Sequence, residues 1–179
     1  MKKLMLLLFV FVGFVKLNAQ GISADTIKSQ LVKDWERAKA YTNAYLAAMP
    51  ADKYGAKAVD SIPRTFAGQM LHLTAGTIGL VGNGTGAQRI FPGFDMEHSP
   101  GAQSKDSVAF YVNAGYDYAI NSIKNMDVSK LGEHVKRGPF DETKYAWIMK
   151  AFEHQTHHRG QATIYIRLQG IRPPNEQLF

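Results

Sequence analysis

The segment Glu153-His154-Gln155-Thr156-His157-His158-Arg159-Gly160-Gln161 decides the fold of this chain. It continues a helical pattern in which His154 and His158 lie four positions apart. On a helix, residues at that spacing project from nearly the same face, one turn apart. Imidazole is the commonest protein ligand for divalent transition metals, so the pair predicts a metal ion held on a helix face.

The helix that carries this pair is predicted from Glu142 to Gln169, with Asp141 as its N-cap and with Gly170 and Pro173 after its end. Two buried imidazoles without partners would cost ~1–3 kcal/mol each, whereas leucine would fill a core without that cost. The pattern therefore favours a metal ligand pair over two histidines satisfied within the core, which is the alternative. The inward stripe is expected to carry Trp147, Ala151, His154, His158, Gln161, Ala162, Tyr165 and Leu168.

Three further segments show helical periodicity, at 25–49, 63–81 and 105–126. Ser61 is expected to cap the second and Ser104 the third. Pro50 ends the first segment. Four helices joined by long connections predict an all-α fold, a four-helix bundle in one domain over residues 20–179.

His72, in the second helix, is the expected third ligand. Its face carries small or amide-bearing neighbours rather than large apolar ones. Glycine inside a helix costs ~0.8–1 kcal/mol relative to alanine, so several on one face indicate that a packed helix or an occupied pocket approaches closely. Gly160 is expected to mark another close contact. The neighbours of His72 on this face are Gly68, Gln69, Ala75, Gly76 and Gly79.

Other motifs in the chain predict no separate chemistry. Residues 82–87 fit a loose G-x-G-x-x-A pattern, but the sequence after them does not open a helix as a dinucleotide site requires. The HExxH zinc-protease motif is absent because Gln155 stands at the position of its glutamate. His98 and His134 fall in expected loops and are expected to be surface histidines.

The first residues predict an export signal at 1–19. Lys2 and Lys3 precede an apolar run from Leu4 to Val15, and a cleavage site is expected before Gln20. The run is shorter than the ~20 apolar residues of a membrane-spanning helix, so no stable membrane anchor is expected after cleavage. The mature protein is therefore expected outside the cytoplasm, periplasmic or secreted.

Composition excludes several functions. The chain of 179 residues has 21 basic and 15 acidic side chains, a net charge of +6, of which three basic residues belong to the expected signal. The remaining charges of both signs are interspersed rather than gathered in a basic stripe, so nucleic-acid binding is not expected. The absence of cysteine excludes thiolate ligands and a catalytic thiol.

The motif His-x-x-x-His-Arg-Gly-Gln, followed by Leu-Gln-Gly-Ile-Arg-Pro-Pro, resembles the last helix of the DinB-like (DinB/YfiT) family. The stretch from Thr65 to Leu73 is similar to that family's conserved-histidine helix. The resemblance implies a four-helix bundle, often dimeric, with a divalent metal such as Zn, Ni, Fe or Mn held by His72, His154 and His158. It also implies that His157 is not a ligand, in agreement with its position ~100° around the helix from His158.

These features predict an exported metal-dependent hydrolase or transferase that acts on a small molecule. A thiol-dependent transferase is less expected, because low-molecular-weight thiols are chiefly cytoplasmic. Gln69 and Gln161 are expected to hydrogen-bond the ligands. A non-catalytic bundle that binds a metal or another ligand is the alternative, because no general base is identified. Glu153, Asp117 and Arg159 could serve as a base or a substrate clamp, but the sequence favours an ordinary solvated charge for each of them.

Overall fold

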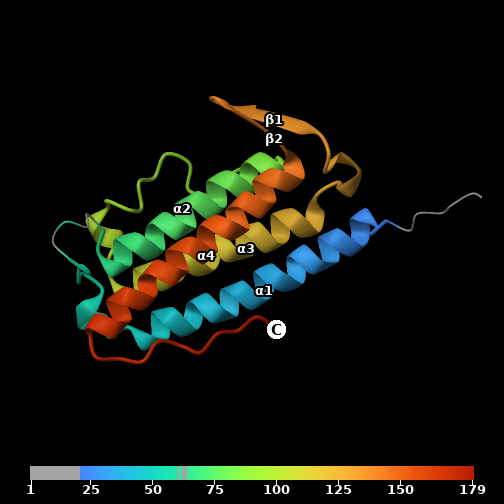
Figure 1. The fold of residues 1–179 in the computed structure, drawn as a ribbon. Helices are drawn as coiled ribbons and strands as arrows, with labels where there is room; N and C mark the ends of the chain where they lie inside the picture. Colours follow the sequence, from blue (N-terminus) through green and yellow to red (C-terminus); the bar gives the residue numbers. More distant parts are fainter. Residues whose placement is uncertain (1–20, 60, 62–63) are drawn as a thin grey trace, which may run out of the picture.

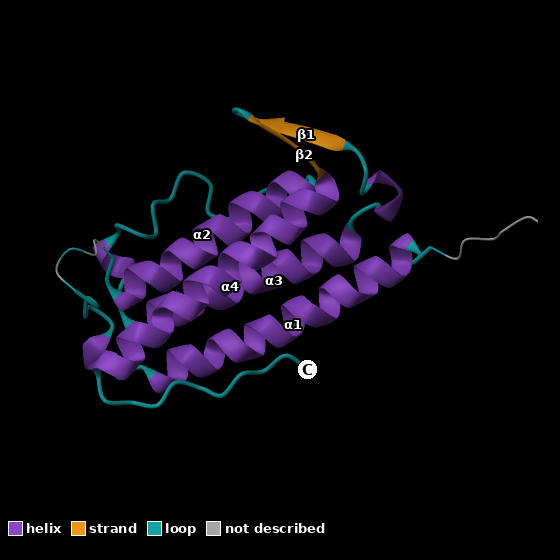
Figure 2. Ribbon diagram, viewed as in Figure 1, coloured by secondary structure: helices purple, strands orange, loops and turns teal. Residues whose placement is uncertain are grey.

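The computed structural model describes residues 21–59, 61 and 64–179. The expected signal peptide lies outside this part of the chain. The described residues form a bundle of four long helices (Figure 1) with a small two-stranded hairpin at one end (Figure 2). The helices are α1 (Ala24–Ala48), α2 (Phe66–Thr85), α3 (Lys105–Asn125) and α4 (Lys144–Leu168). Short 3-10 helices lie at Ala51–Lys53, Pro100–Ala102 and Val128–Lys130.

The helices run up, down, down and up. In Figure 1, α1 and α4 run in one direction and α2 and α3 in the other. α2 packs against both α4 and α3, while α1 completes the bundle against α3 and α4. The connection from α2 to α3, residues 86–104, returns along the length of the bundle. Long connections were predicted, and this one brings Glu97 to His72 of α2.

The core is built from the inward stripes of the four helices. Its largest side chains are fully buried, and Trp35 on α1 packs edge-on against Tyr116 of α3, with ring centroids 5.8 Å apart. Tyr54 and Phe66 form a second such pair at 5.0 Å. Edge-to-face aromatic pairs add about 0.5–1.5 kcal/mol beyond their buried area. None of the four helices, nor any other described helix, is long and apolar enough to cross a membrane.

Two predicted caps are wrong. α2 begins at Phe66 rather than near Pro63, because Thr65, not Ser61, accepts the hydrogen bond from the backbone N–H of Gly68. It also extends beyond Val81 to Thr85. α4 begins at Lys144, since Thr143 rather than Asp141 is its N-cap and accepts from Ala146. The predicted cap Ser104 is confirmed.

The hairpin is a departure from the all-α prediction. β1 (His134–Arg137) and β2 (Phe140–Thr143) pair antiparallel, with Gly138 at φ +57 in the turn. The residues expected to open the fourth helix therefore form β2 instead. Trp147 Nε1 of α4 donates to Val135 O at 2.9 Å, so the hairpin is tied to the bundle.

Candidate metal centre

The structure brings the three predicted ligands together at the seam between α2 and α4. One ring nitrogen from each of His72, His154 and His158 lies within 4.8 Å of the other two. The ring centroid of His158 lies 4.5 Å from the ring centroid of His72 and 4.4 Å from that of His154. Metal–nitrogen bonds of about 2.0–2.1 Å put two ligand atoms at most ~4.2 Å apart, so small side-chain rotations would close the set around an ion. His157 is outside this group, as predicted, and is exposed.

Gly76 makes room for His154. A Cβ on Gly76 would lie 2.1 Å from Cε1 and 2.6 Å from Nδ1 of the His154 ring. The close approach predicted for the glycine face of α2 is therefore confirmed at Gly76, and the approaching group is a candidate ligand. Gly79 and Gly160, by contrast, have no atom within 4 Å of the corresponding Cβ position, so the expected contact at Gly160 is wrong.

The donor atoms fit a divalent cation. Nδ1 of His154 is buried and has no hydrogen-bond partner among the described residues. An unsatisfied buried polar atom costs about 1–3 kcal/mol, and coordination of a cation would satisfy it. Three neutral imidazoles suit Zn, Ni, Fe or Cu, and they leave coordination positions for water or substrate. The group is thus able to hold one metal ion.

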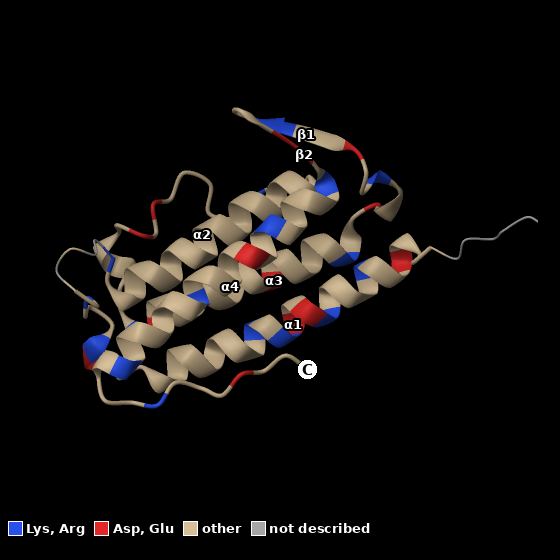
Figure 3. Ribbon diagram, in the orientation of Figure 1, with Lys and Arg blue, Asp and Glu red and all other residues tan. Residues whose placement is uncertain are grey.

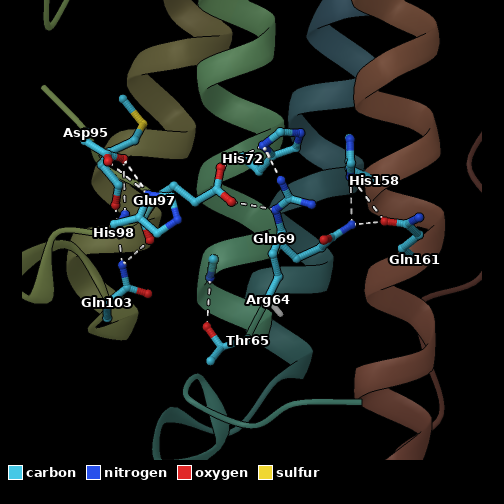
Figure 4. A network of polar contacts seen from close by, with 12 residues as sticks. Arg64, Thr65, Gln69, His72, Asp95, Glu97, His98, Gln103, His158 and Gln161 are labelled. Carbon is cyan, nitrogen blue, oxygen red and sulfur yellow. Dashed lines mark hydrogen bonds and ion pairs between the residues drawn. The ribbon is translucent and has the colours of Figure 1, made fainter. Parts of the chain in front are cut away.

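His72 is oriented by Glu97, a residue that sequence reasoning missed (Figure 4). Nδ1 of His72 donates to Oε2 of Glu97 at 2.7 Å, which leaves Nε2 available as a ligand. Arg64 Nε donates to the other oxygen of Glu97 at 2.6 Å. Burial acts to raise the pKa of Glu97, but the hydrogen bonds from His72 and Arg64 outweigh it and hold that pKa below its usual value. The carboxylate is therefore ionised, and carboxylate–histidine pairs of this kind fix the tautomer of metal ligands.

Gln69 and Gln161 contact His158, as predicted. Nε2 of Gln69 lies 2.8 Å and Oε1 of Gln161 3.2 Å from Nδ1 of His158. Gln69 also donates to Oε1 of Gln161, so the pair joins α2 to α4 beside His158 (Figure 4). Both amides lie against the Nδ1 edge of His158, so Nε2 is the ring nitrogen left to face an ion.

The residues considered as bases lie elsewhere. Arg159 is buried rather than solvated. Its NH1 donates to Gln155 Oε1 at 2.8 Å and to Thr42 Oγ1 at 3.3 Å, so it serves the core between α4 and α1. Asp117 pairs with Lys39 at 2.6 Å, and Glu153 is exposed. Within the described part of the chain, no carboxylate joins the three-histidine group.

Leu168 was predicted on the inward stripe of the last helix, and this is wrong, because it is 56% exposed.

Removing the Glu97 carboxylate is expected to weaken metal binding about 10–100-fold, the usual cost of losing the partner of a ligating histidine. Glu97→Ala would remove the acceptor for His72 Nδ1, and Glu97→Gln only its charge. Metal affinity would be measured by competition with a chromophoric chelator. Glu36→Gln, which breaks an exposed ion pair with Lys124, is the matched control. An affinity unchanged in Glu97→Ala would show that Glu97 does not orient the ligand.

The metal-free protein is expected to lose stability as the pH falls from about 6.5 to about 4. Burial, followed by the charges of the neighbouring imidazoles, lowers the pKa of His154 and of His158 to about 4. In this range the unfolded chain binds protons at both positions and the folded chain does not, so stability rises with pH. After discounting for solvent screening, each histidine should contribute on the order of 1 kcal/mol.

The measurement is urea unfolding of chelator-treated protein between pH 4 and pH 7. The double variant His154→Gln/His158→Gln should show a flatter pH dependence than the wild type. Equal slopes for the two proteins would mean that the histidines do not carry this effect.

Comparisons with known proteins found a family match for the last part of the chain and solved structures with a similar fold. The model of the DinB family matches residues 137–178, which include the hairpin turn, α4 and the tail after it. A DinB-like protein from Bacillus cereus ATCC 10987 has the same fold, with a TM-score of 0.69 and 18% identity over 83% of this chain and 97% of its own. A DinB-like protein from Bacillus subtilis superposes with a TM-score of 0.65 and 15% identity over 84% of this chain and 96% of its own. No curated protein matches the sequence.

Proposed function

We propose that this chain is a member of the DinB-like family and an exported metalloenzyme that hydrolyses or transfers a group on a small molecule. The family match at residues 137–178 and the shared fold support the first part of this proposal. The observation that carries the proposal is the group of three histidines from two helices, one ligand fewer than a closed tetrahedral site holds. Export rests on the sequence pattern at residues 1–19.

The residues around the histidines have separate tasks in this proposal. Glu97 holds His72 by its Nδ1 proton, and the amides of Gln69 and Gln161 contact Nδ1 of His158. His154, seated over Gly76 and neutral at pH 7, offers a free lone pair. When bound, a divalent ion held by neutral ligands supplies a Lewis acid that can polarise a carbonyl or lower the pKa of water to about 7. The chain itself supplies the neutral ligands, their orientation and a partly buried setting.

A second candidate is a bundle that binds a metal or a ligand without turnover. It is favoured by one observation: Glu97, the carboxylate nearest His72, is already engaged by His72 and Arg64. No other carboxylate joins the three-histidine group in the described part of the chain. Proton transfer would then depend on solvent or on the substrate.

Turnover separates the two candidates. Protein purified without an affinity tag would be stripped, reloaded with Zn, Ni, Mn or Fe, and assayed on a panel of esters, amides, lactones and thiol adducts. Activity that appears with a metal and disappears in His154→Ala supports the enzyme. Stoichiometric metal binding with no turnover on the whole panel supports the binding protein. Absence of metal binding would overturn the enzyme and would leave the second candidate only as a bundle that binds another ligand.

A further inference from the structure

Two arginines meet on one amide oxygen at the hairpin end of α2. Arg89 NH2 donates to Oδ1 of Asn83 at 2.8 Å, and Arg137 Nε of β1 donates to the same oxygen at 3.2 Å. The two guanidinium nitrogens therefore lie no more than 6.0 Å apart, the sum of the two distances. Asn83 is 8% exposed, so the shared acceptor is fixed in the helix while both guanidinium groups reach the surface.

Neither arginine has a carboxylate partner among the described residues. The two acids of β2 are engaged elsewhere: Asp141 with His134 at 3.0 Å and Glu142 with Lys150 at 3.0 Å. Figure 3 shows β1 as basic at this end of the molecule. Two like charges this close repel each other, and a bound anion would remove that repulsion. Guanidinium pairs are also suited to bidentate recognition of carboxylate or phosphate.

The arginine pair lies on the same face of α2 as the candidate metal centre. His72, Gly76, Gly79 and Asn83 follow one another at spacings of four, three and four residues, which is one stripe of a helix. At 1.5 Å per residue, Asn83 is about 10 Å from Gly76, the seat of His154, and about 16 Å from His72. Between them, the Cβ position of Gly79 has no atom within 4 Å, and Arg89 also donates to Gly79 O at 3.3 Å.

We propose that Arg89 and Arg137 form an oxoanion site that binds the acidic end, a carboxylate or a phosphate, of an extended substrate whose reactive group lies at the three histidines. The arginines are positioning residues in this proposal. Only the placement of the substrate's reactive group at the three histidines rests on the proposed function. The substrate class is then an anionic small molecule long enough to span the about 10–16 Å of α2 between the two sites.

The anion site can be tested without metal. Inorganic phosphate and acetate would each be titrated into chelator-treated protein at constant ionic strength, with amide and arginine Nε–H NMR shifts as the readout. Saturable shifts in residues 79–89 and 134–143 are expected. Arg89→Gln and Arg137→Gln should each weaken binding about tenfold, and Arg137→Lys less. The comparison of the two probes shows which oxoanion is preferred.

Lys136→Gln is the matched control, since it removes the same charge from the next position of β1, on the opposite face of the strand. The fluorescence of Trp147, which bonds to Val135, reports whether the hairpin stays attached in each variant. The site would be overturned if neither phosphate nor acetate bound saturably. It would also be overturned if Lys136→Gln weakened anion binding as much as the arginine variants do. Because the protein is metal-free here, that failure would leave the proposed metal function untouched, and loss of metal binding would leave the anion result standing.

Discussion

Replacing His158 with alanine is expected to remove the metal from this protein almost completely. Wild-type protein should bind about one ion per chain, as a single three-ligand group implies. Loss of a ligand costs more than loss of the partner of a ligand, so affinity should fall by more than about 100-fold. Elemental analysis of tag-free protein gives the stoichiometry, and chelator competition gives the affinity.

His157→Ala is the matched control for this experiment. His157 is the next residue on α4, but it is exposed and lies outside the three-histidine group. Its removal takes away a contact with Nε2 of Gln161 at 2.9 Å but no candidate ligand, so metal affinity should change far less than in His158→Ala. Circular dichroism of His158→Ala checks that the bundle still forms, since His158 also contacts Gln69. Metal content equal to that of wild type in a folded His158→Ala protein would contradict the assignment of this site.

The grouping of the three histidines was predictable because helix geometry carries most of the information. Four-residue spacing places His154 and His158 on one face whatever the tertiary fold. The glycines around His72 then indicated that another group approaches that face, and His154 is that group at Gly76. Local periodicity also located α1 and α3 to within one or two residues.

Glu97 could not be predicted, because its position depends on the path of a long connection. It lies 25 residues from His72 in a segment without periodicity, and nothing in the local sequence marks it as a histidine partner. The available signal was length, because a long connection between two helices of a small bundle is uncommon and often functional. The pairing of Arg89 with Arg137 is non-local in the same sense, since 48 positions separate the two residues.

The errors at the helix starts have a common cause. Ser61, Asp141, Thr65 and Thr143 are all acceptable N-caps by residue type, and only tertiary structure selects among them. At α2 the backbone N–H of Phe66 is bonded to Ala56 O, which holds the preceding chain extended up to Thr65. At α4 the pairing of β2 with β1 does the same up to Thr143. Arg159 was expected at the surface or at the site for a related reason. A charged residue is buried only where the fold supplies partners such as Gln155, and local sequence does not show those partners.

Substituting Gly76 with alanine is expected to abolish metal binding while leaving the bundle folded. The new Cβ would lie 2.1 Å from Cε1 of His154, a distance that requires the ring to move. The imidazole is the end of a side chain, so it can rotate away at modest cost, but its nitrogen then leaves the ligand group. Alanine also favours the helix by ~0.8–1 kcal/mol relative to glycine, which offsets part of the cost of displacing the ring. Metal affinity should therefore fall about as far as in His154→Ala, with little change in the free energy of unfolding of the metal-free protein.

Two comparisons make this result specific to the contact between Gly76 and His154. Gly79→Ala adds the same methyl group to the same helix where no atom lies within 4 Å, so it should keep the metal and stabilise the protein by about 0.5–1 kcal/mol. In the His154→Ala background, Gly76→Ala should have no further effect on metal affinity and should be as stabilising as Gly79→Ala, because the clash is gone. If Gly76→Ala instead retained wild-type affinity, His154 would not need its position against Gly76 to bind the ion. That result would refute the three-histidine geometry that carries the proposed function.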